Sequence, residues 1–191
     1  MTRPEARKAM DDAAIRRLAA RMNRPVVLVG MMGVGKSTVG RRLAQALRFD
    51  FADADDEIAE AAQLSIPEIF DQYGEDFFRD GERRVIARLL ERPQCVIATG
   101  GGAFVQPDTR ALICERGLPV WLDAEIDTLV ERVGRNDRRP LLRGGDRRAI
   151  VTRMKAEREG AYAQAPIRVT SDRGPHADTV MRILEALKPC P

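Results

Sequence analysis

Short apolar runs alternate with segments of helical periodicity along most of the chain. The run at 26–29 (Val-Val-Leu-Val) predicts a buried strand, and the apolar positions Val39, Leu43 and Leu47 predict a helix at 37–47 directly after it. The pattern predicts further strands at 49–54, 95–98, 120–122 and 167–170, and further helices at 65–73, 75–91, 107–117, 126–133, 149–162 and 179–187. This alternation indicates a three-layer α/β/α protein. Helices should cover both faces of a parallel sheet, and a ligand should bind at the carboxyl ends of the strands.

The chain divides at about residue 25. Residues 1–24 carry charges of both signs around a few apolar positions and precede the first strand, so we expect an N-terminal extension that is either helical or disordered. A transit peptide is the functional alternative, but Glu5, Asp11 and Asp12 are atypical of one. Residues 25–191 are long enough for a single domain with its own core.

Composition narrows the class of protein. The 32 basic and 29 acidic residues are interleaved, which argues against a general surface for nucleic acid despite a net charge of +3. No apolar run is long enough to span a membrane, and Cys95, Cys114 and Cys190 are too few and too scattered for a disulfide framework or a zinc site. We expect a cytoplasmic, monomeric protein that acts on small molecules and binds neither nucleic acid nor membrane.

A phosphate-binding loop follows the first predicted strand. Residues 30–37 read Gly-Met-Met-Gly-Val-Gly-Lys-Ser, which matches the Gly-x-x-x-x-Gly-Lys-Ser/Thr pattern at every fixed position. Glycines let backbone N–H groups curl around phosphate oxygens, Lys36 adds positive charge, and the Ser37 hydroxyl can ligate Mg²⁺. A chance glycine-rich turn is the alternative, but the strand before the loop and the helix after it favour a nucleotide site. The nucleotide-binding residues in this loop are predicted to be Gly33, Val34, Gly35, Lys36, Ser37 and Thr38.

Two other segments carry candidate chemistry. Asp53 and Asp55 stand at the predicted end of the second strand, where carboxylates can face a ligand. Arginines and glycines are concentrated at 132–148, a composition that suits a mobile lid at about 134–148 closing over phosphates. A solvated basic loop is the alternative interpretation.

Five motifs occur in a fixed order: residues 30–38, Asp-Ala-Asp at 53–55, Phe-Arg-Asp-Gly-Glu at 78–82, Gly-Gly-Gly at 100–102 and Arg-Pro-Leu-Leu at 139–142. In this order and spacing the chain resembles the shikimate kinase family from about residue 26 to residue 187. The resemblance implies a nucleoside-monophosphate-kinase-like fold with five parallel strands in the order 2-3-1-4-5. It also implies ATP-dependent phosphorylation of the shikimate 3-hydroxyl, with Mg²⁺ as the cofactor and ATP as co-substrate.

The resemblance also implies roles for particular residues. Asp55 would bond the shikimate hydroxyls, including the reacting one, and Asp53 would reach Mg²⁺ through water, with Ser37 as the other metal residue. The carboxylate of shikimate would be held by Arg79 and Arg158. The implied roles of the remaining positions are backbone contact with the ring at Gly100, Gly101 and Gly102, contact with the transferring phosphate at Arg139, and contact near the adenine at Arg132 and Arg173. The predicted catalytic residues are Lys36, Asp55 and Arg139.

Alternative interpretations of these residues stay open at this point. Arg79 could pair only with Glu75, four residues earlier, and Arg158 could pair with Glu157 or another neighbour. Glu82 could be an exposed helix charge, the three glycines a bare turn, and His176 a surface or cap residue. For the whole chain, the alternatives are another small-molecule kinase of the same fold, such as a gluconate or nucleotide kinase, and an ATP-binding regulator without transfer activity.

Overall fold

The structure is a computed structural model that describes residues 10–134 and 146–188. Arg139, Cys190 and most of the predicted lid at 134–148 therefore lie outside the described residues. Within the described ranges, no helix is long and apolar enough to cross a membrane.

One parallel sheet of five strands organises the domain. β1 (Val26–Val29) lies at its centre between β3 (Cys95–Ala98) and β4 (Leu118–Asp123), and β2 (Asp50–Asp53) and β5 (Ile167–Thr170) form the two edges. Every neighbouring pair is parallel. The order 2-3-1-4-5 and the α/β class are thereby confirmed. All residues of β1 and β3 are buried, as their unbroken apolar runs predict for strands covered on both faces.

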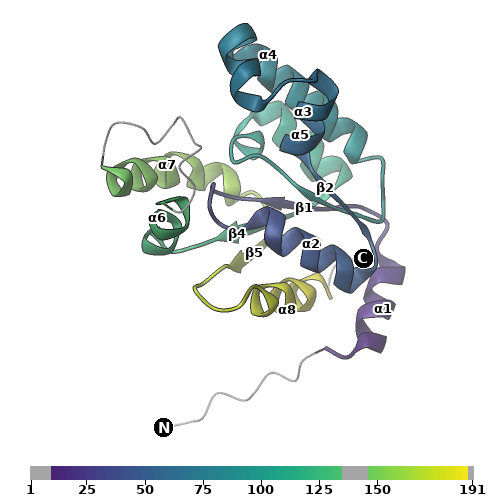
Figure 1. Cartoon of the computed structure of the whole chain (residues 1–191). Helices are drawn as coiled ribbons and strands as arrows, with labels where there is room; N and C mark the ends of the chain where they lie inside the picture. Colours follow the sequence, from purple (N-terminus) through teal and green to yellow (C-terminus); the bar gives the residue numbers. More distant parts are fainter. Residues whose placement is uncertain (1–9, 135–145, 189–191) are drawn as a thin grey trace.

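Helices cover both faces of the sheet. α2 (Lys36–Leu47) and α8 (His176–Leu187) lie on one side, and α4 (Ile66–Leu89) and α5 (Pro107–Arg116) lie on the other (Figure 1). α6 (Ile126–Gly134) packs against α7 (Arg147–Tyr162). The loop between β1 and α2 starts where the strand order changes direction, the position at which open α/β sheets bind ligands.

α4 consists of two helical segments that meet at a kink. The predicted capping box is confirmed, because the Glu68 carboxylate accepts from the Ser65 amide at 2.8 Å while the Ser65 hydroxyl caps the Glu68 amide. Gly74 has φ 80° and ψ 178°, which interrupts the helical backbone where the sequence predicts a stop. The second segment carries the Phe-Arg-x-x-Glu motif, and the kink sets its direction.

Some elements differ from the prediction. β4 begins at Leu118 and ends at Asp123, so it is longer than the three-residue strand predicted at 120–122. A helix that the sequence did not predict, α3 (Ala54–Ala62), follows β2 directly, and a short 3₁₀ helix, η1 (Ala103–Val105), follows the glycine motif. Only Ala54 and Ile58 of α3 are buried, so its periodic apolar signal is too weak to read.

The described part of the predicted N-terminal extension, residues 10–24, contains one helix, α1 (Asp12–Arg21). The Asp11 carboxylate accepts from the Ala14 amide at 2.7 Å and caps this helix. Ile15 and Leu18 are buried, and α1 packs against α2. The separation of residues 1–24 from the domain that follows stays a prediction.

Candidate active site

The loop between β1 and α2 curls because three of its glycines have a left-handed backbone. The φ angles are 136° at Gly30, 79° at Gly33 and 99° at Gly35, a region that residues with side chains rarely adopt. A methyl group on Gly30 would also clash with the Leu122 carbonyl oxygen. Glycine at these positions therefore allows the loop to place its N–H groups at the N-terminus of α2, where an anion is favoured.

Lys36 lies folded over this loop. It is the first residue of α2, its exposure is 8%, and its ammonium group donates to the carbonyl oxygens of Gly30 at 2.8 Å and Met31 at 2.9 Å. A largely buried ammonium group at a helix N-terminus adds to the positive potential of the helix dipole. The loop, the helix end and Lys36 together offer positive potential and N–H donors that suit phosphate groups.

Ser37 and Asp53 join the phosphate loop to the end of β2. The Ser37 hydroxyl donates to Asp53 Oδ2 at 2.6 Å, and the other oxygen of Asp53 accepts from the Asp55 amide at 3.2 Å. Asp53 is the last residue of β2 and the N-cap of α3. The hydroxyl and the carboxylate predicted to serve Mg²⁺ are thus in direct contact.

The glycine loop after β3 lies against two carboxylates. A methyl group on Gly100 would be 2.9 Å from Asp55 Oδ1 and 2.9 Å from Glu82 Oε1. Real Cβ atoms essentially never show contacts below 3.0 Å, so a side chain at this position would require the two carboxylates to shift. The three glycines are therefore not a bare turn, since the absence of a side chain brings backbone and carboxylates together.

Arg79 lies against the far end of the same loop. A methyl group on Gly102 would be 2.6 Å from Arg79 Nη2. The guanidinium donates to Glu82 Oε2 at 2.7 Å and to Glu75 Oε1 at 3.0 Å. Burial lowers the pKa of Arg79, but its hydrogen bonds to Glu82 and Glu75 and their charges outweigh that effect and raise it. The alternative interpretation that Arg79 pairs only with Glu75 is therefore wrong.

Glu82 is a buried carboxylate. Its exposure is 1%, so its interpretation as an exposed helix charge is wrong. Oε2 accepts from Arg79, whereas Oε1 has no hydrogen-bond partner within the described part of the chain. Burial raises the pKa of the Glu82 carboxyl, and the hydrogen bond and charge of Arg79 offset only part of this rise.

Because the pKa of Glu82 is raised, we expect this residue to lower the free energy of unfolding as pH rises. Between the ordinary glutamate value of 4.5 and its raised pKa, the folded protein binds more protons at this site than the unfolded chain, so the free energy of unfolding falls with increasing pH. Glu82→Gln should remove this loss. We expect urea unfolding to show the variant gaining on the wild type above pH 4.5, by at most about 1.4 kcal/mol per pH unit. Glu75→Gln, which changes the exposed partner of Arg79, is the matched control and should show no comparable gain. A constant difference between wild type and Glu82→Gln across pH would contradict the prediction.

Two side chains from α7 reach the middle of the glycine loop. Arg158 Nη1 donates to the Gly101 carbonyl oxygen at 3.4 Å, and the Tyr162 hydroxyl donates to the same oxygen at 2.6 Å. Tyr162 is fully buried and packs against Trp121 of β4 with 6.0 Å between ring centroids. The structure therefore brings Arg158 to the same loop as Asp55 and Arg79.

Arg132 reaches the phosphate loop, and Arg173 lies next to Glu131 of α6. Arg132 Nη1 donates to the Val34 carbonyl oxygen at 3.1 Å, and Nη2 donates to the Asp172 carbonyl oxygen. The Arg173 side chain is exposed, with Nε 3.8 Å from Glu131 Oε2. Their predicted contact with adenine stays a prediction.

Sequence reasoning missed Tyr162 and Ser171, and it treated His176 as a surface or cap residue. His176 begins α8 and is half-buried, with Cε1 3.5 Å from the position of a methyl group on Gly35. Tyr162 contacts a carbonyl 61 residues away, and buried Ser171 contacts one 137 residues away. No local pattern signals such contacts, because they depend on which elements become neighbours in the folded chain.

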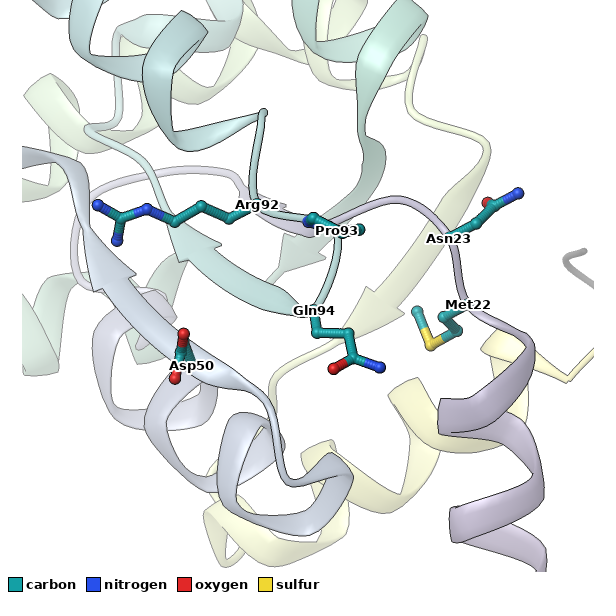
Figure 2. A pocket seen from close by; sticks show the side chains of 6 residues that line it. All are labelled: Met22, Asn23, Asp50, Arg92, Pro93 and Gln94. Carbon is teal, nitrogen blue, oxygen red and sulfur yellow. The ribbon is translucent and has the colours of Figure 1, made fainter.

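A separate hollow lies at the opposite end of the strands from the candidate site, near the amino ends of β2 and β3 (Figure 2). Its volume is about 510 Å³, and its lining residues are Met22, Asn23, Asp50, Arg92, Pro93 and Gln94. None of these residues belongs to the phosphate loop or the glycine loop. The hollow is therefore not part of the candidate site.

The fold and the phosphate loop define the class of phosphate-loop phosphotransferases. The chain belongs to the shikimate kinase family, because the family model described as "Shikimate kinase" matches residues 32–188.

Known proteins give the same assignment. The chain is 59% identical over 182 residues to a shikimate kinase of Novosphingobium aromaticivorans, which covers 93% of this chain and 94% of that protein. The solved structure of shikimate kinase from Acinetobacter baumannii in complex with shikimate has a TM-score of 0.82 and 34% identity, covering 92% of this chain and 96% of that one. A gluconokinase from Sinorhizobium meliloti, with a TM-score of 0.59, 18% identity and coverage of 88% and 94%, shares only the fold.

Proposed function

We propose that this chain transfers the γ-phosphoryl group of ATP to the 3-hydroxyl of shikimate, giving shikimate 3-phosphate for chorismate and aromatic amino acid biosynthesis. The observation that carries the proposal is the convergence of Asp55, Arg79 and Arg158 on the glycine loop. That loop adjoins the phosphate loop, since a methyl group on Gly101 would lie 3.3 Å from the Met32 amide nitrogen. An acceptor held there would lie next to the phosphates.

The residues around the glycine loop suit a small hydroxylated carboxylic acid. Arginine forks are the preferred partners of carboxylates, and Arg79 and Arg158 supply two of them. Asp55 supplies a carboxylate that accepts hydrogen bonds from hydroxyl groups. Shikimate carries one carboxylate and three hydroxyls on a ring, so its groups complement these side chains.

Phosphoryl transfer requires positioning and charge neutralisation more than covalent chemistry. The transition state is loose, with the attacking and leaving oxygens roughly in line. Asp55 would orient the attacking hydroxyl and accept its proton, while Lys36 would neutralise charge on the transferring phosphate. The roles of Arg139 at that phosphate and of Arg132 and Arg173 near the adenine follow from the family resemblance.

The oxygen atoms of Ser37 and Asp53 fit Mg²⁺. Mg²⁺ prefers oxygen ligands and is commonly held by one or two protein groups together with substrate phosphates. The Ser37 hydroxyl and the Asp53 carboxylate, 2.6 Å apart, offer such a set beside the phosphate loop. When bound, Mg²⁺ would neutralise phosphate charge. The cytoplasmic location and the monomeric state also stay predictions.

Replacing Arg79 with Lys should weaken acceptor binding selectively. Lysine keeps the charge but lacks the planar fork that bonds a carboxylate with two parallel hydrogen bonds. We expect the KM for shikimate to rise about 10- to 100-fold, the worth of a charge-assisted hydrogen bond, with the KM for ATP nearly unchanged. Steady-state kinetics in both substrates measures this. Arg83→Lys, an exposed arginine paired with Asp80 on the same helix, is the matched control. Equal rises in both KM values for Arg79→Lys would contradict the role.

A thermal-shift panel distinguishes the proposed acceptor from the alternatives. A ligand at ten times its Kd stabilises the folded state by about 1.4 kcal/mol, which corresponds to roughly 3–6 °C for a chain of this size. Shikimate should raise the Tm by this amount, whereas gluconate and nucleoside monophosphates should not. Stabilisation by gluconate alone would favour a sugar-acid kinase. Nucleotide binding without turnover on any acceptor would favour a regulator.

A further inference from the structure

Two donors converge on one carbonyl group within the phosphate loop. The Val34 carbonyl oxygen accepts from Ser171 Oγ at 3.0 Å and from Arg132 Nη1 at 3.1 Å, and the same Nη1 also donates to Ser171 Oγ at 3.1 Å. We call this arrangement of Val34, Ser171 and Arg132 the carbonyl clamp. It joins the phosphate loop to the residue that follows β5 and to α6.

Both donors are themselves held in place. Ser171 is fully buried, and its amide donates to the Asp123 carbonyl oxygen at 2.6 Å. Arg132 Nη2 is bound to the Asp172 carbonyl oxygen. Backbone groups at the carboxyl ends of β4 and β5 therefore fix the positions of both donors of the clamp.

The clamp holds the Val34–Gly35 peptide, and the glycine restricts rotation of this peptide only weakly. Val34 precedes Gly35, which has φ 99° and ψ 21° and stands at the N-terminus of α2 without a side-chain cap. Glycine has no Cβ to restrict rotation of the peptide unit on either side of it. An unrestrained Val34–Gly35 peptide could rotate away from the orientation that phosphate requires.

A planar trans peptide links the direction of its carbonyl to that of its N–H. The Val34 carbonyl and the Gly35 N–H belong to one plane and point in opposite directions. Fixing the oxygen toward Ser171 and Arg132 therefore fixes the N–H away from them. In a phosphate loop such N–H groups bind phosphate oxygens.

We propose that Ser171 is a positioning residue of the nucleotide site, whose hydroxyl holds the Val34–Gly35 peptide so that the Gly35 N–H faces the phosphates of ATP. This inference rests on the proposed function only in requiring that the loop binds a nucleotide. Ser171 lies outside every motif that the sequence singles out, and it acts through Val34 without touching the substrate.

The test is ADP binding by Ser171→Ala and Ser171→Cys, measured by isothermal titration calorimetry. Both remove the hydroxyl, and cysteine nearly preserves the side-chain volume, so it guards against a packing defect in the alanine variant. We expect the Kd for ADP to rise about tenfold in both, with the Kd for shikimate unchanged. Ser171→Thr keeps the hydroxyl and should restore most of the ADP affinity.

A second readout follows the peptide itself. In protein labelled with ¹⁵N-glycine, the Gly35 amide resonance should shift on ADP binding in the wild type, and this shift should be reduced in Ser171→Cys. Unchanged ADP affinity in a folded Ser171→Cys protein would overturn the proposal. Equal weakening of ADP and shikimate, together with a lower Tm, would also overturn it by assigning Ser171 a purely structural role. A wild type that bound ADP but did not phosphorylate shikimate would refute the proposed function and leave the clamp intact.

Discussion

Asp55→Asn should lower turnover with shikimate by about 10²- to 10⁴-fold, the usual contribution of a positioned general base. The amide still fits beside Gly100 but does not accept the proton of the attacking hydroxyl, and one of its two polar atoms becomes a donor. Because the loose transition state makes orientation as important as proton removal, both losses act on kcat. Steady-state kinetics with Mg-ATP and shikimate measures the change.

Asp56→Asn is the matched control for this experiment. Asp56 directly follows Asp55 in the first turn of α3. It is exposed, and its carboxylate lies 3.8 Å from Arg41. Exposed ion pairs contribute little, so turnover should stay within about twofold of the wild type. Near-wild-type turnover in Asp55→Asn itself would show that Asp55 neither orients the hydroxyl nor accepts its proton.

Lys36→Ala should reduce kcat/KM for ATP by about 10²- to 10³-fold, the loss expected when one preorganised charged donor is removed from a transferring group. Lys36 is largely buried and lies over the loop, so its ammonium group acts in a low-dielectric setting where a charge contributes more than it does in water. Kinetics at varied ATP concentration measures the effect. Far-UV circular dichroism checks that the fold survives the loss of the bonds to Gly30 and Met31.

Lys188→Ala provides the control, because Lys188 is an exposed lysine that pairs with Glu185 beyond the end of α8. It should leave kcat/KM for ATP nearly unchanged. If the Lys36 variant kept kcat/KM within about threefold of the wild type, the charge-neutralising role of Lys36 would be wrong.

The residues that act through local chain geometry could be predicted from the sequence. The phosphate loop follows an apolar strand and precedes a periodic helix, so both its fold and its position were readable from residues 26–47. The capping box at Ser65 and the stop at Gly74 also depend only on neighbours in the chain. The strand order came from the resemblance, since apolar periodicity does not specify which strands are adjacent.

What the sequence did not show depends on contacts between distant segments. Glu82 is a helix residue whose burial is decided by the glycine loop packed against it, and the local pattern fits an exposed position equally well. Ser171 and Tyr162 reach carbonyl groups in loops that only the sheet order brings near them. The sequence did not predict α3 because only two of its nine residues are buried.

The most direct measurement is ADP release by the purified protein with Mg-ATP, in the presence and absence of shikimate, with the phosphorylated product identified by mass. We expect shikimate to stimulate ADP release strongly and to be converted to shikimate 3-phosphate in equal amount. ADP release that was the same with and without shikimate, or that gluconate stimulated and shikimate did not, would contradict the assignment of this site as a shikimate kinase.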